Sequence, residues 1–230
     1  MAGRLAEVQH VKTAFIDECA SARNLVSCIL AIPAKVRPSN AVGIHPKYAQ
    51  QVVELAFMGV VAAWEEFLER SLVRYVAGAT TAGGYRPTPK YGLANNIQHA
   101  YKILSQDPKY DVTRHYLKAT DPAWVCSSAD FVFSAHPYGS LQAKADLIGH
   151  ASTIRNRVAH SSEKCRSEFK ATAVHFLHPP NGTLSQGYGP GKLLLDPVQR
   201  HFGQQVTQQQ VSHFEAYLRM FEALADTIVP

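Results

Sequence analysis

The sequence contains few cysteines and none of the spacings that organise them into sites. Its four cysteines, among 230 residues, include no Cys-x-x-Cys pair and no close Cys/His spacing. Small secreted domains depend on dense disulfides and structural zinc sites need closely spaced ligands, so neither is predicted. We expect buried, reduced thiols, because free cysteine is among the residues found most often in protein cores.

Long uncharged hydrophobic runs are also missing. Near the N-terminus Arg4, Glu7 and Lys12 interrupt any stretch long enough for a signal peptide or a membrane span. We therefore expect a cytoplasmic protein that does not enter a membrane. Hydrophobic residues make up 46% of the chain and charged residues 18%, which is typical of a globular protein with a substantial core.

No block of lysine and arginine marks a nucleic-acid-binding arm. The net charge of +5 favours a polyanionic partner such as RNA or DNA only weakly, since an ordinary solvated surface carries such a surplus equally often.

Sequence motifs for nucleotide cofactors and serine hydrolases are absent as well. The segment GYGPGK at 187–192 superficially resembles a phosphate-binding loop, but it lacks the first glycine and the Ser/Thr after Lys192. His175 and His178 have the spacing of a helical metal pair, yet no acidic partner lies nearby and Pro179 ends the segment. We predict neither a metal nor a cofactor.

Apolar residues recur at steps of three and four through much of the chain, which predicts amphipathic helices at about 4–31, 48–76 and 207–228. The predicted class is all-α, a helical bundle in a single domain over residues 1–230. Two parts interrupt it: an irregular middle region at about 77–139 and a small loop or hairpin insertion near 179–206.

Both interrupting parts contain local signals. Residues 77–91 are rich in Gly, Thr and Pro and predict a loop, with a helical pattern resuming at 93–104. Asp107-Pro108 and Asp121-Pro122 each resemble an N-cap followed by proline at the first helical position, so two short helices are expected. Asn181-Gly182 suggests a turn, and Lys192 to Leu195 is the best strand candidate.

A helix beginning near Ser140 carries an apolar stripe of Leu147, Ala151, Ile154 and Val158, and a second helical piece is expected around 164–175. The opposite side of the first helix bears small or polar residues: Gly149, Ser152, Thr153, Asn156 and His160. Small side chains let another backbone approach closely, so we infer that a second helix, or a second copy of the protein, packs near this face.

Near its end this helix gathers a polar group of residues. Asn156 and His160 are four residues apart and therefore neighbours, whereas Arg155 lies about 140° from His160 on an ideal helix. Arg157, three residues before His160, is the rival arginine. The simpler interpretation is a surface helix end, where His and Arg complement the helix dipole.

Residues 154–161, IRNRVAHS, resemble the Arg-Asn-x-x-x-His motif of HEPN ribonucleases, and AWEEFL at 63–68 is similar to an early helix of the toxin-like branch. The resemblance covers about 48–76 and 140–178. It implies a HEPN-like helical bundle that cleaves RNA without a metal, usually at a site built from two copies of the motif across a homodimer.

The chemistry also follows from the residue types. RNA supplies its own nucleophile, the 2′-hydroxyl, so an enzyme need only move two protons and stabilise charge on the phosphorane. We expect His160 to act as general acid or base, Arg155 to bind the phosphate, and Asn156 to orient the histidine or the substrate. The resemblance further suggests a toxin or phage-defence effector, with a possible antitoxin or regulatory partner.

Two alternatives remain open. One is a catalytically inactive HEPN-like module that binds a partner protein or nucleic acid through the same helical face. A weaker one is a sensor whose insertion binds a small ligand. Separately, Tyr85, Arg86, Lys90 and Tyr91 place aromatic and basic groups in one loop that can stack on single-stranded RNA, although incidental surface tyrosines are more common.

Overall fold

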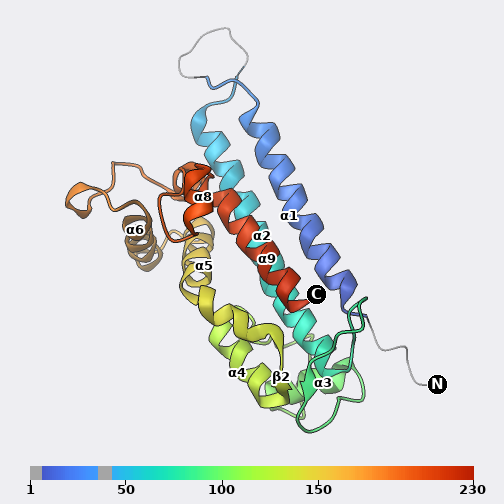
Figure 1. Ribbon diagram of the computed structural model, residues 1–230. Coiled ribbons are helices and arrows are strands. Elements are labelled where there is room, and N and C mark those ends of the chain that lie inside the picture. Colours follow the sequence, from blue (N-terminus) through green and yellow to red (C-terminus); the bar gives the residue numbers. More distant parts are fainter. Residues whose placement is uncertain (1–6, 36–42) are drawn as a thin grey trace. The chain divides into compact units, whose positions relative to one another are not determined.

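The computed structural model describes residues 7–35 and 43–230 (Figure 1). Within these residues the chain is mostly helical, and its two strands form one small sheet. The predicted all-α class is confirmed in this coarse sense. The elements in chain order are α1 (Gln9–Leu30), α2 (Pro46–Val76), β1 (Thr88–Pro89), α3 (Ile97–Ser105), α4 (Pro122–Val132), β2 (Phe133–Ala135), the 3₁₀ helix η1 (Pro137–Lys144), α5 (Ala145–Ala159), α6 (Glu163–Leu177), the 3₁₀ turn η2 (Pro180–Gly182), α7 (Pro190–Leu195), α8 (Gln204–Gln208) and α9 (His213–Ile228).

The long helices follow the predicted periodicity closely. α1 and α2 correspond to the helices expected at 4–31 and 48–76, although residues 4–6 lie outside the described residues. Among the described residues, no helix combines the length and the hydrophobicity that crossing a bilayer requires. The cytoplasmic location stays a prediction.

The chain divides into two compact units, each made of segments distant in sequence. The first contains residues 1–16, 63–145 and 222–230, and the second contains 17–62 and 146–221. Each unit therefore includes a part of α1, α2 and α9. That residues 1–230 form one domain with two insertions stays a prediction.

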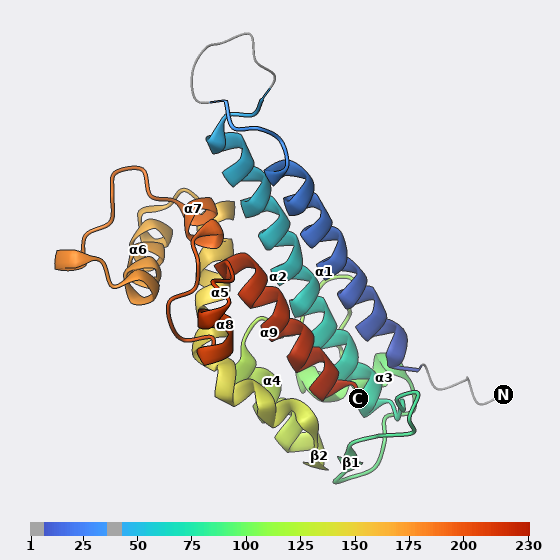
Figure 2. The ribbon, with the colours of Figure 1, turned by 45° about the horizontal axis from the view of Figure 1, so that its top comes forward.

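The core of the first unit is aromatic. The Phe15 ring of α1 lies 5.6 Å from Trp64 and 5.4 Å from Phe67 of α2, measured between centroids. Farther along α2, the Tyr75 hydroxyl donates a 2.9 Å hydrogen bond to the carbonyl of Ile228 in α9. These contacts hold α1, α2 and α9 together within this unit, and β1 pairs antiparallel with β2 beside them (Figure 2).

In the second unit the Phe57 ring of α2 lies 5.2 Å from the Tyr217 ring of α9. Gly191 in α7 approaches α2 so closely that a Cβ there would lie 2.5 Å from the carbonyl oxygen of Gln50. Its N–H donates a 2.8 Å hydrogen bond to Oε1 of Glu54. Glycine is required at this position because the two backbones nearly touch.

The strand predicted at Lys192 to Leu195 is wrong, because these residues belong to helix α7. Pro190 occupies the first helical turn after Gly189, where its fixed φ favours helix. Leucine is also a good helix former, which favours a helix in the short leucine run. This helix is α7, which docks on α2.

Of the two Asp-Pro sites, only Asp121-Pro122 begins a helix. The Asp121 side chain accepts from the Ala123 N–H and caps α4, as predicted. The helix expected after Asp107 is wrong, since Asp107 caps only an isolated turn by accepting from the Lys109 N–H. Asp111 then caps a second turn through Thr113, which prevents a helix from extending.

Other boundaries also differ. Asn181 and Gly182 have φ of 59° and 62° and form the turn η2, so the predicted turn is confirmed. Of the loop and the hairpin that were the alternatives for 179–206, the structure has loops around the short helix α7. The last helix begins at His213 rather than 207, because Gln210 turns the chain with φ 51° and Pro197 bridges to Ser212. Ser140 lies within η1 and donates to the Pro137 carbonyl, so α5 begins only at Ala145.

All four cysteines are free, in agreement with the predicted reduced thiols. Cys19 and Cys126 are buried as expected, whereas Cys28 is exposed and Cys165 is half-buried.

Candidate active site at the end of helix α5

Helix α5 places the predicted apolar stripe in the interior of its unit. Leu147, Ala151 and Ile154 are buried, and Val158 near the helix end is half-buried. This orientation fixes the opposite side of the helix toward the surface. The residues of the Arg-Asn-x-x-x-His motif then occupy the last turn of α5 and the next residue along the chain.

His160 is the first residue beyond α5. Its N–H still donates a 2.9 Å hydrogen bond to the carbonyl of Asn156, so the backbone continues the helical path through this position. A new helix, α6, begins after Ser162, whose Oγ accepts from the Cys165 N–H. The His160 side chain is exposed at this junction, where a substrate can reach it.

Hydrogen bonds connect both arginines to other members of the motif. Nη1 of the half-buried Arg155 donates to Oδ1 of Asn156 at 3.0 Å. Nη1 of Arg157 donates to the backbone carbonyl of His160 at 3.1 Å and caps the end of α5. Arg155 is thus paired with the predicted amide, whereas Arg157 contributes to helix termination.

The surrounding segment is basic. Residues 155–170 contain five Lys or Arg and two Glu. Both glutamates contact cations of α6 itself, with Glu163 lying 3.4 Å from Arg166 and Glu168 lying 3.8 Å from Lys164. A positively charged helix junction attracts phosphate groups.

The small-residue face of α5 is open. A Cβ added at Gly149 would meet no other described atom within 4 Å, and Gly149 itself is exposed. Ser152, Thr153 and Asn156 on the same face are half-buried. The sequence predicted that a second helix or a second copy of the protein packs on this face. Among the described residues, no second helix of the chain packs against Gly149.

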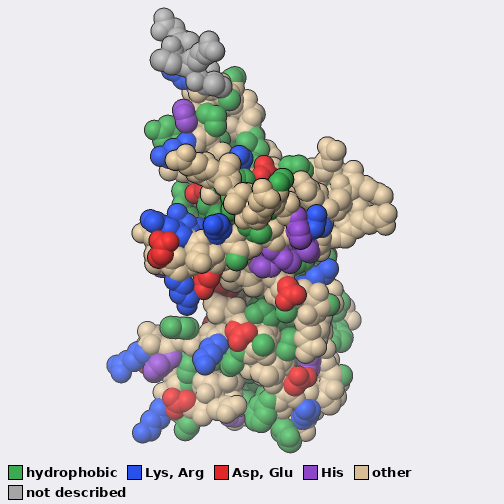
Figure 3. Space-filling view, turned by 90° about the vertical axis from the view of Figure 1, so that its left-hand side faces the viewer, with side chains coloured by type: hydrophobic (Ala, Val, Ile, Leu, Met, Phe, Trp, Pro, Cys, Tyr) green, Lys and Arg blue, Asp and Glu red, His purple; other side chains and the backbone are tan. Residues whose placement is uncertain are grey.

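A group of histidines lies next to this region and was not predicted. The rings of His150 in α5, His175 in α6 and His201, between α7 and α8, form a continuous series that we call the histidine stack. His175 is 4.7 Å from His150 and 4.1 Å from His201, measured between centroids. Histidine side chains gather on the corresponding face in Figure 3. Sequence spacing contains no signal for this group, because its members come from three separate elements.

Two members of the histidine stack have lowered pKa values. Burial lowers the pKa of His150, and the neighbouring His175 lowers it further, while Asp146 opposes the shift. Burial and His175 likewise lower the pKa of His201, with Arg200 contributing in the same direction. The His150 ring is fixed by a 3.0 Å hydrogen bond between Nδ1 and Oγ1 of Thr172.

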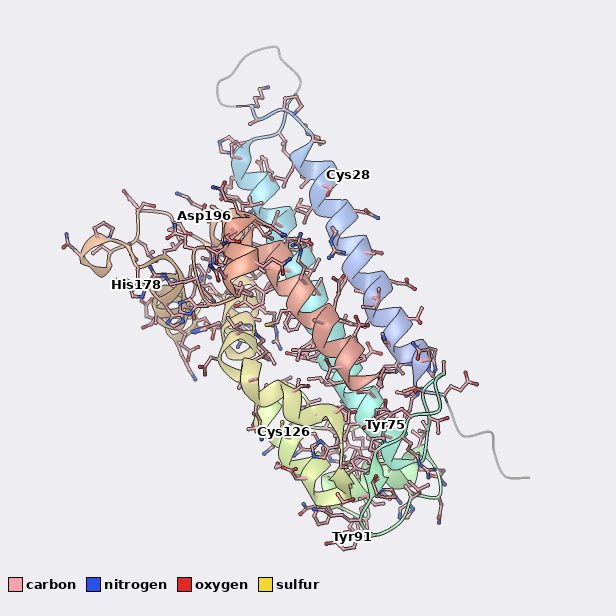
Figure 4. All side chains as sticks on the ribbon, viewed as in Figure 1. Cys28, Tyr75, Tyr91, Cys126, His178 and Asp196 are labelled. Atoms are coloured by element: carbon pink, nitrogen blue, oxygen red, sulfur yellow. The ribbon has the colours of Figure 1, made fainter. Side chains whose placement is uncertain are left out.

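His175 and His178 lie in different local settings. His175 belongs to the histidine stack. His178 follows the last residue of α6 and has a left-handed backbone conformation, with φ 44° (Figure 4). Across residues 7–35 and 43–230, no group of three or more histidine, cysteine or acidic side chains is placed to hold a metal ion.

Comparison with known proteins adds no relative: no family model, no curated protein and no solved structure matches the chain. The similarity to HEPN ribonucleases thus stays a hypothesis that depends on residues 154–161 and 63–68.

Proposed function

We propose that this chain is a metal-independent endoribonuclease with a HEPN-like helical fold, and that it cleaves RNA by attack of the 2′-hydroxyl to leave a 2′,3′-cyclic phosphate. One observation carries the proposal. A guanidinium, an amide and an exposed imidazole occur together at the end of α5, with Arg155 bonded to Asn156 and His160 one helical turn beyond Asn156.

Each residue has a role that suits its chemistry. His160 transfers the proton of the 2′-hydroxyl or of the leaving 5′-oxygen, because imidazole titrates near neutral pH. Arg155 stabilises the negative charge that develops on the phosphorane, because guanidinium stays charged and forms paired hydrogen bonds with phosphate oxygens. Asn156 positions Arg155 through the bond that they share.

A homodimer supplies the second proton-transfer group. One imidazole cannot be base and acid in the same step, whereas two motifs that meet across a two-fold axis provide both. The open face around Gly149 supports this arrangement, because a second copy can approach it closely. The resemblance adds the cellular role of a toxin or phage-defence effector with a possible antitoxin or regulatory partner.

Cleavage of end-labelled single-stranded RNA in excess EDTA tests the activity. We expect wild-type protein to cut, and His160→Ala and Arg155→Ala to be inactive. Matched controls are His115→Ala and Arg114→Ala, which remove an exposed histidine and an exposed arginine outside the motif. If wild-type protein leaves RNA intact at several pH values, with and without added metal, the catalytically inactive binding module replaces this proposal.

The dimer has a separate test. Gly149→Arg adds a long side chain in open space, so the isolated chain should fold normally, whereas a second copy should be displaced. Light scattering should show a dimer for wild-type protein and a monomer for Gly149→Arg, with loss of cleavage. Gly139→Arg, at another open glycine, is the control. A monomeric wild-type protein would remove the shared site.

A further inference from the structure

A pocket of about 300 Å³ lies in the first compact unit, between α3 and the junction of α4 with β2. Its lining includes Leu93, His99, Ile103, Phe131 and Tyr91. We refer to it as the aromatic pocket. Its volume is at the lower end of the range of about 300–1,000 Å³ seen for small-molecule sites, so it suits a single ring system.

Two large aromatic rings stand exposed at the aromatic pocket. Tyr91 is 82% exposed and Phe131 is 50% exposed, and their ring centroids are 6.3 Å apart at an interplanar angle of 49°. Tyr91 projects away from the ribbon in Figure 4. At this angle a flat ligand can stack on one ring and touch the edge of the other, which removes apolar surface from water.

Backbone hydrogen bonds hold the segments that carry both rings. The Lys90 N–H donates a 2.9 Å hydrogen bond to the Val132 carbonyl, which joins the residue before Tyr91 to the residue after Phe131. Gly92 then turns the chain with φ 102°, and the Ala94 N–H bonds to the carbonyl of Val76. The exposed rings therefore stand on a tethered segment.

One nitrogen-bearing ring lines an otherwise mostly apolar pocket. Nδ1 of His99 accepts the Asn95 N–H at 3.2 Å, so the neutral ring has its proton on Nε2. That Nε2–H is a donor for an acceptor at the edge of a ligand. A heteroaromatic ring fits this pocket, because its faces can stack on the aromatic side chains and its edge can accept a hydrogen bond from His99.

Two lysines lie near the aromatic pocket, together with the carboxylate of Asp130, which precedes Phe131 and lies 2.9 Å from His136. Lys90 precedes Tyr91 in the chain, and its Nζ donates to the backbone carbonyl of Asp130, which precedes Phe131. Lys102 follows His99 by three positions on α3 and is its neighbour on the helix surface. No acidic residue lines the pocket in the part of the chain that the structure describes. Lys90 and Lys102 can each form a charge-assisted hydrogen bond with a phosphate on the ligand.

We propose that the aromatic pocket binds a nucleobase that carries a phosphate, with Tyr91 and Phe131 against the ring, His99 at its edge and lysines near the phosphate. The source is either a free nucleotide or an unstacked base of single-stranded RNA. The pocket lies in a different compact unit from residues 154–161, so the proposal holds whether or not the chain cleaves RNA.

Titration calorimetry with the full chain tests this site, using the His160→Ala variant so that RNA stays intact. The probes are AMP, a short oligoadenylate and ribose 5-phosphate. We expect AMP to bind and ribose 5-phosphate, which lacks the base, not to bind. Tyr91→Ala and Phe131→Ala should each weaken AMP binding about tenfold, as expected for loss of one base-stacking contact. Tyr48→Ala, which removes another exposed tyrosine, should have no effect.

The outcomes separate the sources. Tighter binding of the oligoadenylate than of AMP, sensitive to Tyr91→Ala, identifies RNA as the ligand, whereas binding of AMP alone identifies a free nucleotide. The proposal is overturned if neither probe binds at millimolar concentration, or if Tyr91→Ala and Phe131→Ala bind AMP like wild-type protein. Binding of an apolar dye without nucleotide binding also overturns it and indicates an apolar partner.

Discussion

Replacement of Asn156 by alanine should slow RNA cleavage without abolishing it. Arg155 donates a 3.0 Å hydrogen bond to Oδ1 of Asn156, and this bond has a charged donor. Such bonds contribute about 1.5–3 kcal/mol, and the lower end applies here because the pair is only partly buried. If this energy holds the guanidinium in position for the transition state, its loss corresponds to about a tenfold lower rate, since about 1.4 kcal/mol is one factor of ten.

Single-turnover cleavage of labelled RNA by Asn156→Ala measures this effect. Asn156→Asp is the matched control, because a carboxylate keeps an acceptor for Arg155 and should retain more of the rate. Thermal unfolding should show that both variants are folded. A rate for Asn156→Ala within a factor of two of wild type, or as low as that of His160→Ala, would refute the positioning role of this bond.

Three further predictions concern stability. Ser71→Ala leaves the buried Tyr138 hydroxyl without its 2.9 Å partner, so the free energy of unfolding measured in urea should fall by about 1–3 kcal/mol. The double variant Ser71→Ala/Tyr138→Phe should recover most of this loss. Gly191→Ala should destabilise the fold by about 1–3 kcal/mol or more, because its Cβ meets backbone atoms. Gly189→Ala is the control and should be tolerated, because its Cβ would approach only a Glu54 oxygen, at 3.8 Å. Equal melting temperatures for the two variants would contradict the close approach at Gly191. The pKa values of His150 and His201 are lowered in the folded state, so the unfolded chain binds more protons. The free energy of unfolding should therefore fall as pH falls below about 6.5. A His150→Gln variant with the same acid sensitivity would show that the histidine stack is not the cause.

The long helices and the apolar stripe of α5 were predictable because burial imposes a strict period on the sequence. Leu147, Ala151 and Ile154 repeat at steps of three and four, and all three are buried. The location of His160 at the end of this helix followed from the same pattern. Its side-chain neighbours did not, because periodicity defines a helix face and not the groups that approach that face.

Short elements were predicted less well because tertiary contacts decide them. A run such as Lys192 to Leu195 fits a strand or a helix equally, and the choice depends on docking against Glu54 and Gln50, far away in the sequence. Asp107-Pro108 and Asp121-Pro122 look alike locally. They differ in the next residues along the chain, since Asp111 caps a competing turn shortly after Asp107.

The aromatic pocket and the histidine stack illustrate the same limit. The loop containing Tyr91 suggested base stacking, but Phe131 and His99 could be assigned to the pocket only after β1 and β2 had been placed side by side. The histidine stack brings together residues from three elements, and no spacing rule links them.

The chemical nature of the RNA ends produced in EDTA tests the central proposal most directly. Mass spectrometry of the products should find 2′,3′-cyclic phosphate and 5′-hydroxyl ends, and a single 2′-deoxy substitution on the 5′ side of the cut should block cleavage there, because the nucleophile is missing. Products with 3′-hydroxyl and 5′-phosphate ends, or unchanged cutting at the 2′-deoxy position, would contradict the mechanism assigned to Arg155 and His160.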